Sequence, residues 1–231
     1  MKHNILLSSI IMVGLLFTSC KKKDNNNSTS YKQPTVSYKL MATNTDYIMA
    51  KTTALANIHW TSGFANPDMI KFDATKDNAS VEFTSTNSPQ VDIMSSVATD
   101  FGGFTLPAGT YDRVSLKIRL DSDGPSPSLQ LNGQFVFDSL TLPVMLQVNE
   151  SVELQTEQNN VTISGDSAFI AVTTLDLSGI TSGITSTMLL NAQLTNGTIV
   201  ISSNSNHDLY HTILTNLGVM HHHCEFEHHH H

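Results

Sequence analysis

The sequence has few basic residues and few charged residues in general. It carries 12 Lys and Arg against 20 Asp and Glu in 231 residues, which gives a formal net charge of −8. Because proteins that bind nucleic acid display a basic patch, this balance argues against nucleic acid as a partner. Hydrophobic residues still make up 39% of the chain and charged residues only 14%. Such a composition can bury a core and is not typical of global disorder.

Long hydrophobic runs are also scarce. Only Ile5–Phe17 is mostly apolar over thirteen residues, whereas a transmembrane helix needs about 20. Lys2 precedes this run, and the small residues Thr18 and Ser19 follow it. A positive start, a short apolar core and small residues are typical of a signal peptide. We therefore expect residues 1–19 to direct export and to be removed.

Cys20 gives this leader a specific chemistry. The run Leu16-Phe17-Thr18-Ser19-Cys20 resembles the lipobox of bacterial lipoproteins, in which the cysteine thiolate accepts a diacylglycerol. The resemblance implies that Cys20 becomes the acylated N-terminus and anchors the chain in a membrane. No Asp stands next to the cysteine, which by resemblance to known sorting signals implies the outer membrane. Whether the domain faces the periplasm or the outside stays open.

Acylation of Cys20 has a consequence for the only other cysteine. Cys224 would have no intrachain partner, so no disulfide framework is expected. Residues 20–35 are polar, rich in Asn and Ser, and begin with Lys21-Lys22-Lys23 after the cysteine. These lysines can lie against anionic lipid head groups. The segment is interpreted as a flexible tether.

From Val36 onward, short β-branched or aromatic runs are separated by turn residues, a pattern typical of strands. The clearest alternation, Val114–Leu120, puts its apolar side chains on one face of a strand and Ser115, Lys117 and Arg119 on the other. Strands are predicted at residues 36–41, 55–60, 69–73, 80–84, 91–95, 113–120, 129–137, 142–148, 151–156, 167–174 and 198–202. Turns are predicted at residues 66–68, 107–109, 121–125, 157–160 and 196–197. Many short strands predict a single antiparallel β-sandwich over residues 36–205, either transthyretin-like or immunoglobulin-like.

Helices are predicted only near the C-terminus. Residues 186–193 fit one short helix. A second helix begins near Asn206, with Ser205 or Asn206 as its N-cap and Gly218 as its stop. Residues 206–231 thus form a C-terminal helix and a histidine-rich tail. The run Leu106–Tyr111 resembles a feature of small β-sandwich domains in uncharacterised Gram-negative surface lipoproteins and of transthyretin-like sandwiches, which implies a sandwich and no catalytic residues.

Two short motifs suggest a hydrolase as an alternative. Gly165-Asp166-Ser167 resembles the serine motif of Gly-Asp-Ser lipid hydrolases, and Asp208 with His211 would supply the base and its orienting carboxylate. That family places its serine near the start of an α/β domain, whereas this serine comes late and among strands. We interpret residues 165–167 as a turn and predict no enzymatic activity.

Two further segments suggest other ligands. Asp121-Ser122-Asp123-Gly124 hints at a calcium loop, but a helix–loop–helix calcium site needs a glycine at the sixth position of the loop and a glutamate at the twelfth, and neither is present. A hairpin turn is therefore predicted, and a Ca²⁺ held by loop carboxylates stays an alternative. Trp60, with Tyr47 and His59, could form a sugar-stacking platform. Ile58 and Trp60 share one face of a strand, however, which predicts that Trp60 is buried and that His59 points the other way.

Histidines are concentrated at the C-terminus, where nine of eleven fall in the last 25 positions. His207 and His211 are separated by about 40° around a helix, an arrangement suited to chelating a metal. Imidazole, thiol and carboxylate donors suit Zn²⁺, Cu or Ni²⁺. The candidate ligands are His207, His211, His221, His222, His223, Cys224, His228, His229, His230 and His231.

These observations predict a membrane-anchored, non-enzymatic envelope lipoprotein that binds or sequesters a transition metal through its C-terminus. The alternative is a cell-surface adhesin or a carbohydrate-binding module, whose partner would be an envelope glycan. An exposed cluster of imidazoles favours the first function, and an exposed aromatic groove favours the second. A hydrolase would need Ser167 and His211 within hydrogen-bond reach. A solvated histidine tail without a physiological ligand stays open as well.

Overall fold

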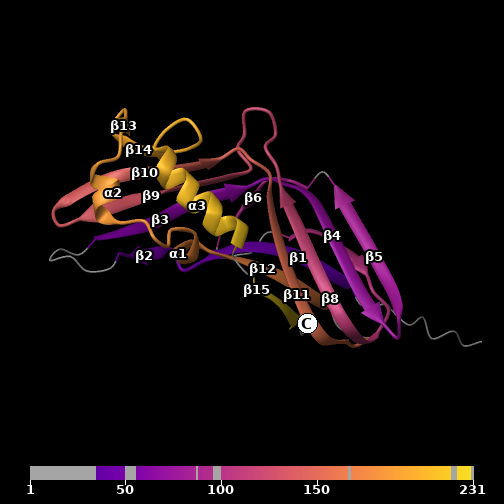
Figure 1. Ribbon diagram of the computed structural model, residues 1–231. Coiled ribbons are helices and arrows are strands. Elements are labelled where there is room, and N and C mark those ends of the chain that lie inside the picture. Colours follow the sequence, from indigo (N-terminus) through magenta and orange to yellow (C-terminus); the bar gives the residue numbers. More distant parts are fainter. Residues whose placement is uncertain are drawn as a thin grey trace, which may run out of the picture. The chain divides into compact units, whose positions relative to one another are not determined.

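The strands of the described residues form three β-sheets (Figure 1). The computed structural model describes residues 35–49, 56–86, 88–95, 100–165, 168–219 and 223–229, the last of these as backbone. All of them belong to the unit Lys32–His231. The other unit, Met1–Tyr31, contains the leader and Cys20 and lies outside the described residues.

The first sheet contains the most deeply buried strand. In spatial order its strands are β15 (His223–His229), β12 (Ala168–Asp176), β1 (Thr35–Thr43) and β7 (Asp100–Thr105). β12 runs parallel to β1 and antiparallel to β15. Five consecutive residues of β12, from Phe169 to Thr173, are buried, as expected for a strand covered on both faces.

The second and third sheets share a corner. The second sheet has the order β13 (Leu194–Thr195), β14 (Thr198–Ile201), β10 (Leu140–Val148), β9 (Leu129–Phe137), β3 (Ala56–Ala65) and β2 (Asp46–Ile48), and β6 (Val91–Asp92) also pairs with β3. The third sheet has the order β11 (Val152–Ile163), β8 (Gly109–Leu120), β4 (Pro67–Lys76) and β5 (Ala79–Thr86). Very short connections join β3 to β4 and β10 to β11. At each of these connections the chain passes from the second sheet to the third, and we call this place the corner.

Two polar side chains hold this corner. The Asn66 amide nitrogen donates to the Pro127 carbonyl at 2.7 Å, and the Asn66 side-chain oxygen accepts from Gln90 at 3.1 Å. The buried Ser128 hydroxyl lies 2.9 Å from the Val148 carbonyl oxygen and 2.7 Å from that of Glu150. Because backbone groups at a strand break lose their ladder partners, these side chains satisfy carbonyls that would otherwise be costly to bury.

An ion pair lies next to the corner. The Arg119 guanidinium donates hydrogen bonds to both carboxylate oxygens of Asp68. This guanidinium holds the pKa of the Asp68 carboxyl below its usual range. The pair joins β4 to β8 at the end of the third sheet, where both strands reach the corner.

Phe104 on β7 joins the first sheet to the third. Its ring lies 4.4 Å from that of Phe72 on β4, 5.0 Å from that of Phe83 on β5 and 5.6 Å from that of Tyr38 on β1, between ring centroids. Phe72 and Tyr38 are fully buried. Offset and tilted rings at these separations attract one another beyond the area that they bury. Phe104 therefore contributes to the contact between two sheets.

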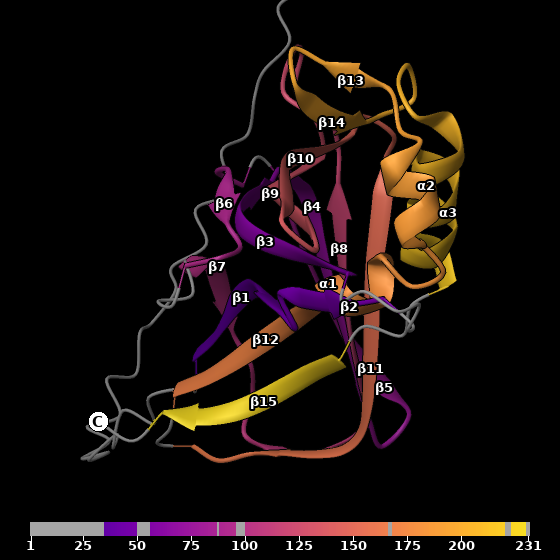
Figure 2. The same cartoon turned by 90° about the vertical axis from the view of Figure 1, so that its left-hand side faces the viewer.

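Within the described ranges, three helices cover part of the fold: α1 (Leu177–Ile180), α2 (Ser186–Leu190) and α3 (His207–Val219). Asp176 caps α1 and Thr185 caps α2, each through a side-chain oxygen that accepts from the helix backbone. Figure 2 shows α2 and α3 together on one side, with β15 beside β12 on another. In the residues that the structure describes, every helix falls short of what is needed to span a bilayer.

The prediction of a mostly β sandwich with a short C-terminal helix is confirmed. The sheets are not purely antiparallel, because β1 pairs with β12 and β10 pairs with β14 in parallel. The predicted turn at residues 157–160 is wrong: β11 continues through it, and Asn160 adopts a left-handed φ of 58° within the strand. Asn tolerates this conformation better than most residues do.

Other elements differ in their limits. α2 ends at Leu190, short of the predicted residue 193, and α3 continues through Gly218 to Val219. Sequence patterns missed α1, β2, β7, β13 and β15. The missed β2 and β13 have three and two residues, too few to show a period. In β7, Gly102-Gly103 interrupts the alternation that would identify a strand.

Phe104→Ala should lower the free energy of unfolding by about 3 kcal/mol, because it removes a large side chain from between the sheets. Denaturant unfolding followed by circular dichroism measures this difference. Phe104→Leu, which keeps most of the volume, should cost less than half as much. Equal, negligible losses in both variants would contradict the assigned packing role.

Candidate metal-binding site

Burial of one face of α3 determines which of its side chains reach solvent. Leu209, Tyr210, Ile213 and Leu217 are buried, and they recur at the spacing of one helical face. The helix contacts β14, β11 and α1. The Tyr210 hydroxyl also donates a hydrogen bond to the Glu150 carboxylate at the β10–β11 connection. With that face fixed, the opposite face is exposed.

The first turn of α3 is held by Asn206, which has a left-handed φ of 53°. Its side-chain oxygen accepts from the Gln193 backbone nitrogen at 2.7 Å. Its amide nitrogen donates to the Gln193 carbonyl at 2.9 Å and to the Val200 carbonyl at 2.7 Å. Asn206 occupies the predicted N-cap position, because its carbonyl accepts from the Tyr210 backbone nitrogen at 3.0 Å. Its side chain does not cap the helix and binds Gln193 and Val200 on either side of the β13–β14 turn instead. This clamp fixes where the helix begins.

His207 and His211 lie together on the exposed face of α3, as their spacing predicts. Their ring centroids are 6.3 Å apart and the ring planes differ by 5°. Two imidazoles bound to one tetrahedral Zn²⁺ through bonds of about 2.0 Å have centroids roughly 5 Å apart. Side-chain rotation alone can therefore bring both rings onto one ion, without a change in the helix.

A groove of about 430 Å³ lies beside this pair, between α2 and the first turn of α3. His207 and Asp208 line it from α3, Thr187 and Met188 line it from α2, and Asn191 lines it from the residue that follows α2. The polar groups that α2 offers are hydroxyl and amide groups, which are weaker ligands for Zn²⁺ or Cu²⁺ than imidazole or thiolate. Within the described residues, no group of three or more His, Cys, Asp or Glu is arranged to hold a metal. The pair would thus supply two ligands and leave other coordination positions open.

The tail candidates are separated from this pair by the helix. α3 has 13 residues and so is about 20 Å long, with the pair at its start and the tail after its end. The backbone of His223, Cys224, His228 and His229 belongs to β15, where Cys224 pairs with Thr173 of β12. His221, His222, His230 and His231 lie outside the described residues, as does Cys20. A ladder-paired strand was not expected for this tail.

The residues proposed for a hydrolase are not assembled within the described residues. Ser167 and Asp166 lie outside them. Asp208 and His211 are both exposed, and in the part of the chain that the structure describes no hydrogen bond joins the Asp208 carboxylate to the His211 imidazole. At the predicted calcium-like turn, Asp123 and Ser126 exchange two backbone hydrogen bonds of 3.0 Å, which confirms the turn.

The predicted burial of Trp60 is confirmed, because Trp60 is 1% exposed and Ile58 fully buried. Trp60 therefore cannot serve as a sugar-stacking platform on the surface. His59 points to solvent, where its Nδ1 lies 2.7 Å from an Asp46 carboxylate oxygen. Sequence patterns missed this pair because β2, which carries Asp46, is too short to be recognised.

Asn206→Gly should weaken the attachment of α3, because glycine keeps the left-handed backbone conformation but loses three hydrogen bonds. We expect the free energy of unfolding to fall by about 2 kcal/mol. Hydrogen exchange should show faster exchange in the first turn of α3 than in wild type. Asn196→Gly, at another exposed left-handed position, serves as the control and should leave that turn unchanged. Unaltered exchange in Asn206→Gly would contradict the clamp.

Comparison with known proteins adds no relative: no family model, no curated protein and no solved structure matches this chain.

Proposed function

We propose that this protein is a lipid-anchored lipoprotein of the bacterial outer membrane that binds transition-metal ions through its C-terminal histidines and catalyses no reaction. The observation that carries the proposal is the exposed pair of parallel imidazoles on α3, 6.3 Å apart between centroids. Imidazole suits Zn²⁺, Cu²⁺ and Ni²⁺. The burial that fixes α3 means that the pair needs little reorganisation to bind an ion.

The geometry favours two separate metal-binding elements over one composite site. The pair occupies the first two turns of α3, whereas the tail follows its last turn. His223, Cys224, His228 and His229 belong to β15, so joining them to His207 and His211 would require β15 to leave its ladder with β12. Because that ladder satisfies backbone groups of both strands, we propose that the helix pair and the tail each bind metal independently.

The arrangement of β15 also decides how the tail should be tested. Deletion after Met220 would remove an edge strand together with the histidines, so lost binding would not distinguish ligation from unfolding. The better variant keeps the backbone: Gln at His221, His222, His223 and His228–His231, with Cys224→Ser. Glutamine preserves size and polarity but is a poor ligand for these metals.

Calorimetry with Zn²⁺ at pH 7.5 should resolve two classes of site in the wild-type chain. His207→Ala/His211→Ala should abolish one class, and the tail variant should abolish the other. His59→Ala, which removes an exposed histidine outside both elements, is the control and should bind as wild type does. Protons compete with metal for imidazole nitrogen, so binding should fall at least about tenfold at pH 5.5.

The proposal would be defeated if the double variant and the tail variant each bound as much metal as the wild-type chain. Loss of all binding in the tail variant, with no effect in the double variant, would show that the tail acts alone.

The anchor is tested separately. Cys20→Ser should lose acylation and move from the membrane to the soluble fraction, because serine cannot form the thioether that holds the lipid. Cys224→Ser, the matched control, should stay with the membrane. Fractionation followed by mass spectrometry of the N-terminal peptide measures both effects. Membrane association of Cys20→Ser at the wild-type level would rule out the lipoprotein assignment.

A further inference from the structure

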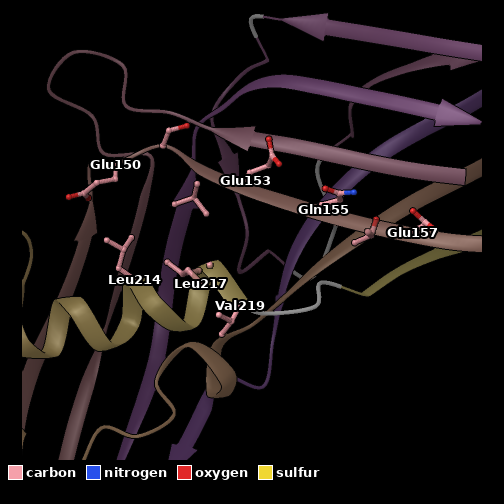
Figure 3. Close-up of a pocket in the computed structure, with 11 residues that line it drawn as sticks. Glu150, Glu153, Gln155, Glu157, Leu214, Leu217 and Val219 are labelled. Atoms are coloured by element: carbon pink, nitrogen blue, oxygen red, sulfur yellow. The ribbon is translucent and has the colours of Figure 1, made fainter.

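A second groove lies at the other end of α3, away from the histidine pair. It has a volume of about 800 Å³ and runs between β11 and the second half of the helix. Figure 3 shows Leu214, Leu217 and Val219 along α3 on one side, and Glu153 and Glu157 along β11 on the other. Val219 is 70% exposed, so it presents an apolar surface to this groove.

The β11 side of the groove is the edge of a sheet. In the part of the chain that the structure describes, β8 is the only strand that pairs with β11, so the other edge of β11 has no ladder, although β15 also lies against β11. Residues 150–153 and 155–157 all line the groove. Successive side chains of a strand point to opposite faces of the sheet. Because residues from both faces of β11 line the groove, the groove must follow the edge of the strand. Unpaired N–H and C=O groups at such an edge can pair with another extended chain.

The charge of the groove is negative. Among the described residues that line it, Glu150, Glu153 and Glu157 are acidic and none is Lys or Arg. Glu153 and Glu157 each have a cation on β8, with Lys117 at 2.8 Å and Arg113 at 3.5 Å. Both glutamates nevertheless keep close to half of their side-chain surface exposed, at 47% and 43%, so they can accept further hydrogen bonds.

The end of α3 adds to this negative potential. The last turn of the helix, which contributes Leu217, Gly218 and Val219 to the groove, contains no basic residue. The terminal carbonyl groups of a helix carry a partial negative charge that a cation nearby would stabilise. The groove thus combines an open strand edge, an apolar wall and a negative charge. These are the three features that an extended basic peptide needs in a binding site.

We propose that the groove between β11 and α3 binds an extended basic segment of another protein, which adds to β11 as a further strand. Main-chain hydrogen bonds to the edge supply affinity, and alternate side chains supply specificity. Lysine or arginine side chains on one face of the segment would meet the glutamates of β11. Apolar side chains on its other face would contact Leu214, Leu217 and Val219. This surface is distinct from the histidine pair, so either proposal can fail alone.

Fluorescence anisotropy of the full chain tests the proposal, with a labelled octapeptide of alternating lysine and valine as the probe and EDTA present. The peptide should bind saturably. The triple variant Glu150→Gln/Glu153→Gln/Glu157→Gln should bind it at least about tenfold more weakly, as expected for lost charge-assisted hydrogen bonds. A control triple variant, Glu82→Gln/Asp123→Asn/Asp138→Asn, changes the net charge equally at exposed sites away from the groove and should bind as wild type does.

A second arm separates strand addition from attraction between charges. The same peptide with every backbone amide N-methylated keeps its lysines but cannot donate to a strand edge, so it should bind at least about tenfold more weakly. Circular dichroism of each variant checks that the fold is retained. Three results would overturn the proposal. They are binding of the methylated peptide as tight as that of the unmethylated one, the same loss of affinity in the groove variant and the control variant, and no binding of the peptide by the wild-type chain.

Discussion

Burial of one face of α3 is the constraint on which the candidate site depends. Leu209, Ile213 and Leu217 pack into the core, and Asn206 fixes the residue at which the helix begins. A helix held at its start and along one face has no freedom to rotate, so the exposed face is determined by the sequence spacing. The histidine pair at one end of α3 and the peptide groove at the other are both consequences of this single packing arrangement.

The sheets that receive α3 depend on a corner that is largely polar. Asn66 and Ser128 bind carbonyl groups where β3 passes into β4 and β10 into β11. These bonds let two strand pairs change direction without leaving buried backbone groups unsatisfied. It also places the start of β11, with Glu150, where the Tyr210 hydroxyl of α3 reaches it. Corner and helix are therefore connected by one side-chain hydrogen bond.

Alternation and helical spacing predicted most of the strands, the C-terminal helix, the burial of Trp60 and the exposure of the histidine pair, because each follows from a local period. Other features depend on contacts that no local pattern contains. The parallel pairing of β12 with β1 joins residues far apart in the chain. The N-cap position of Asn206 was predicted, but its side-chain bonds to Gln193 and Val200 were not, because they join residues that only the tertiary fold brings together. β15 was missed because histidine and glutamate carry no strand period.

His207 and His211 on α3 are proposed to bind a metal ion without help from the tail, and side-chain NMR tests this most directly. In ¹⁵N-histidine-labelled chain whose tail histidines are replaced by glutamine, Zn²⁺ at pH 7.5 should shift the ring nitrogen signals of His207 and His211 together, to a common saturation point. The His59 signals should not move. Unchanged His207 and His211 signals at saturating Zn²⁺, or a shift of one ring without the other, would contradict the account.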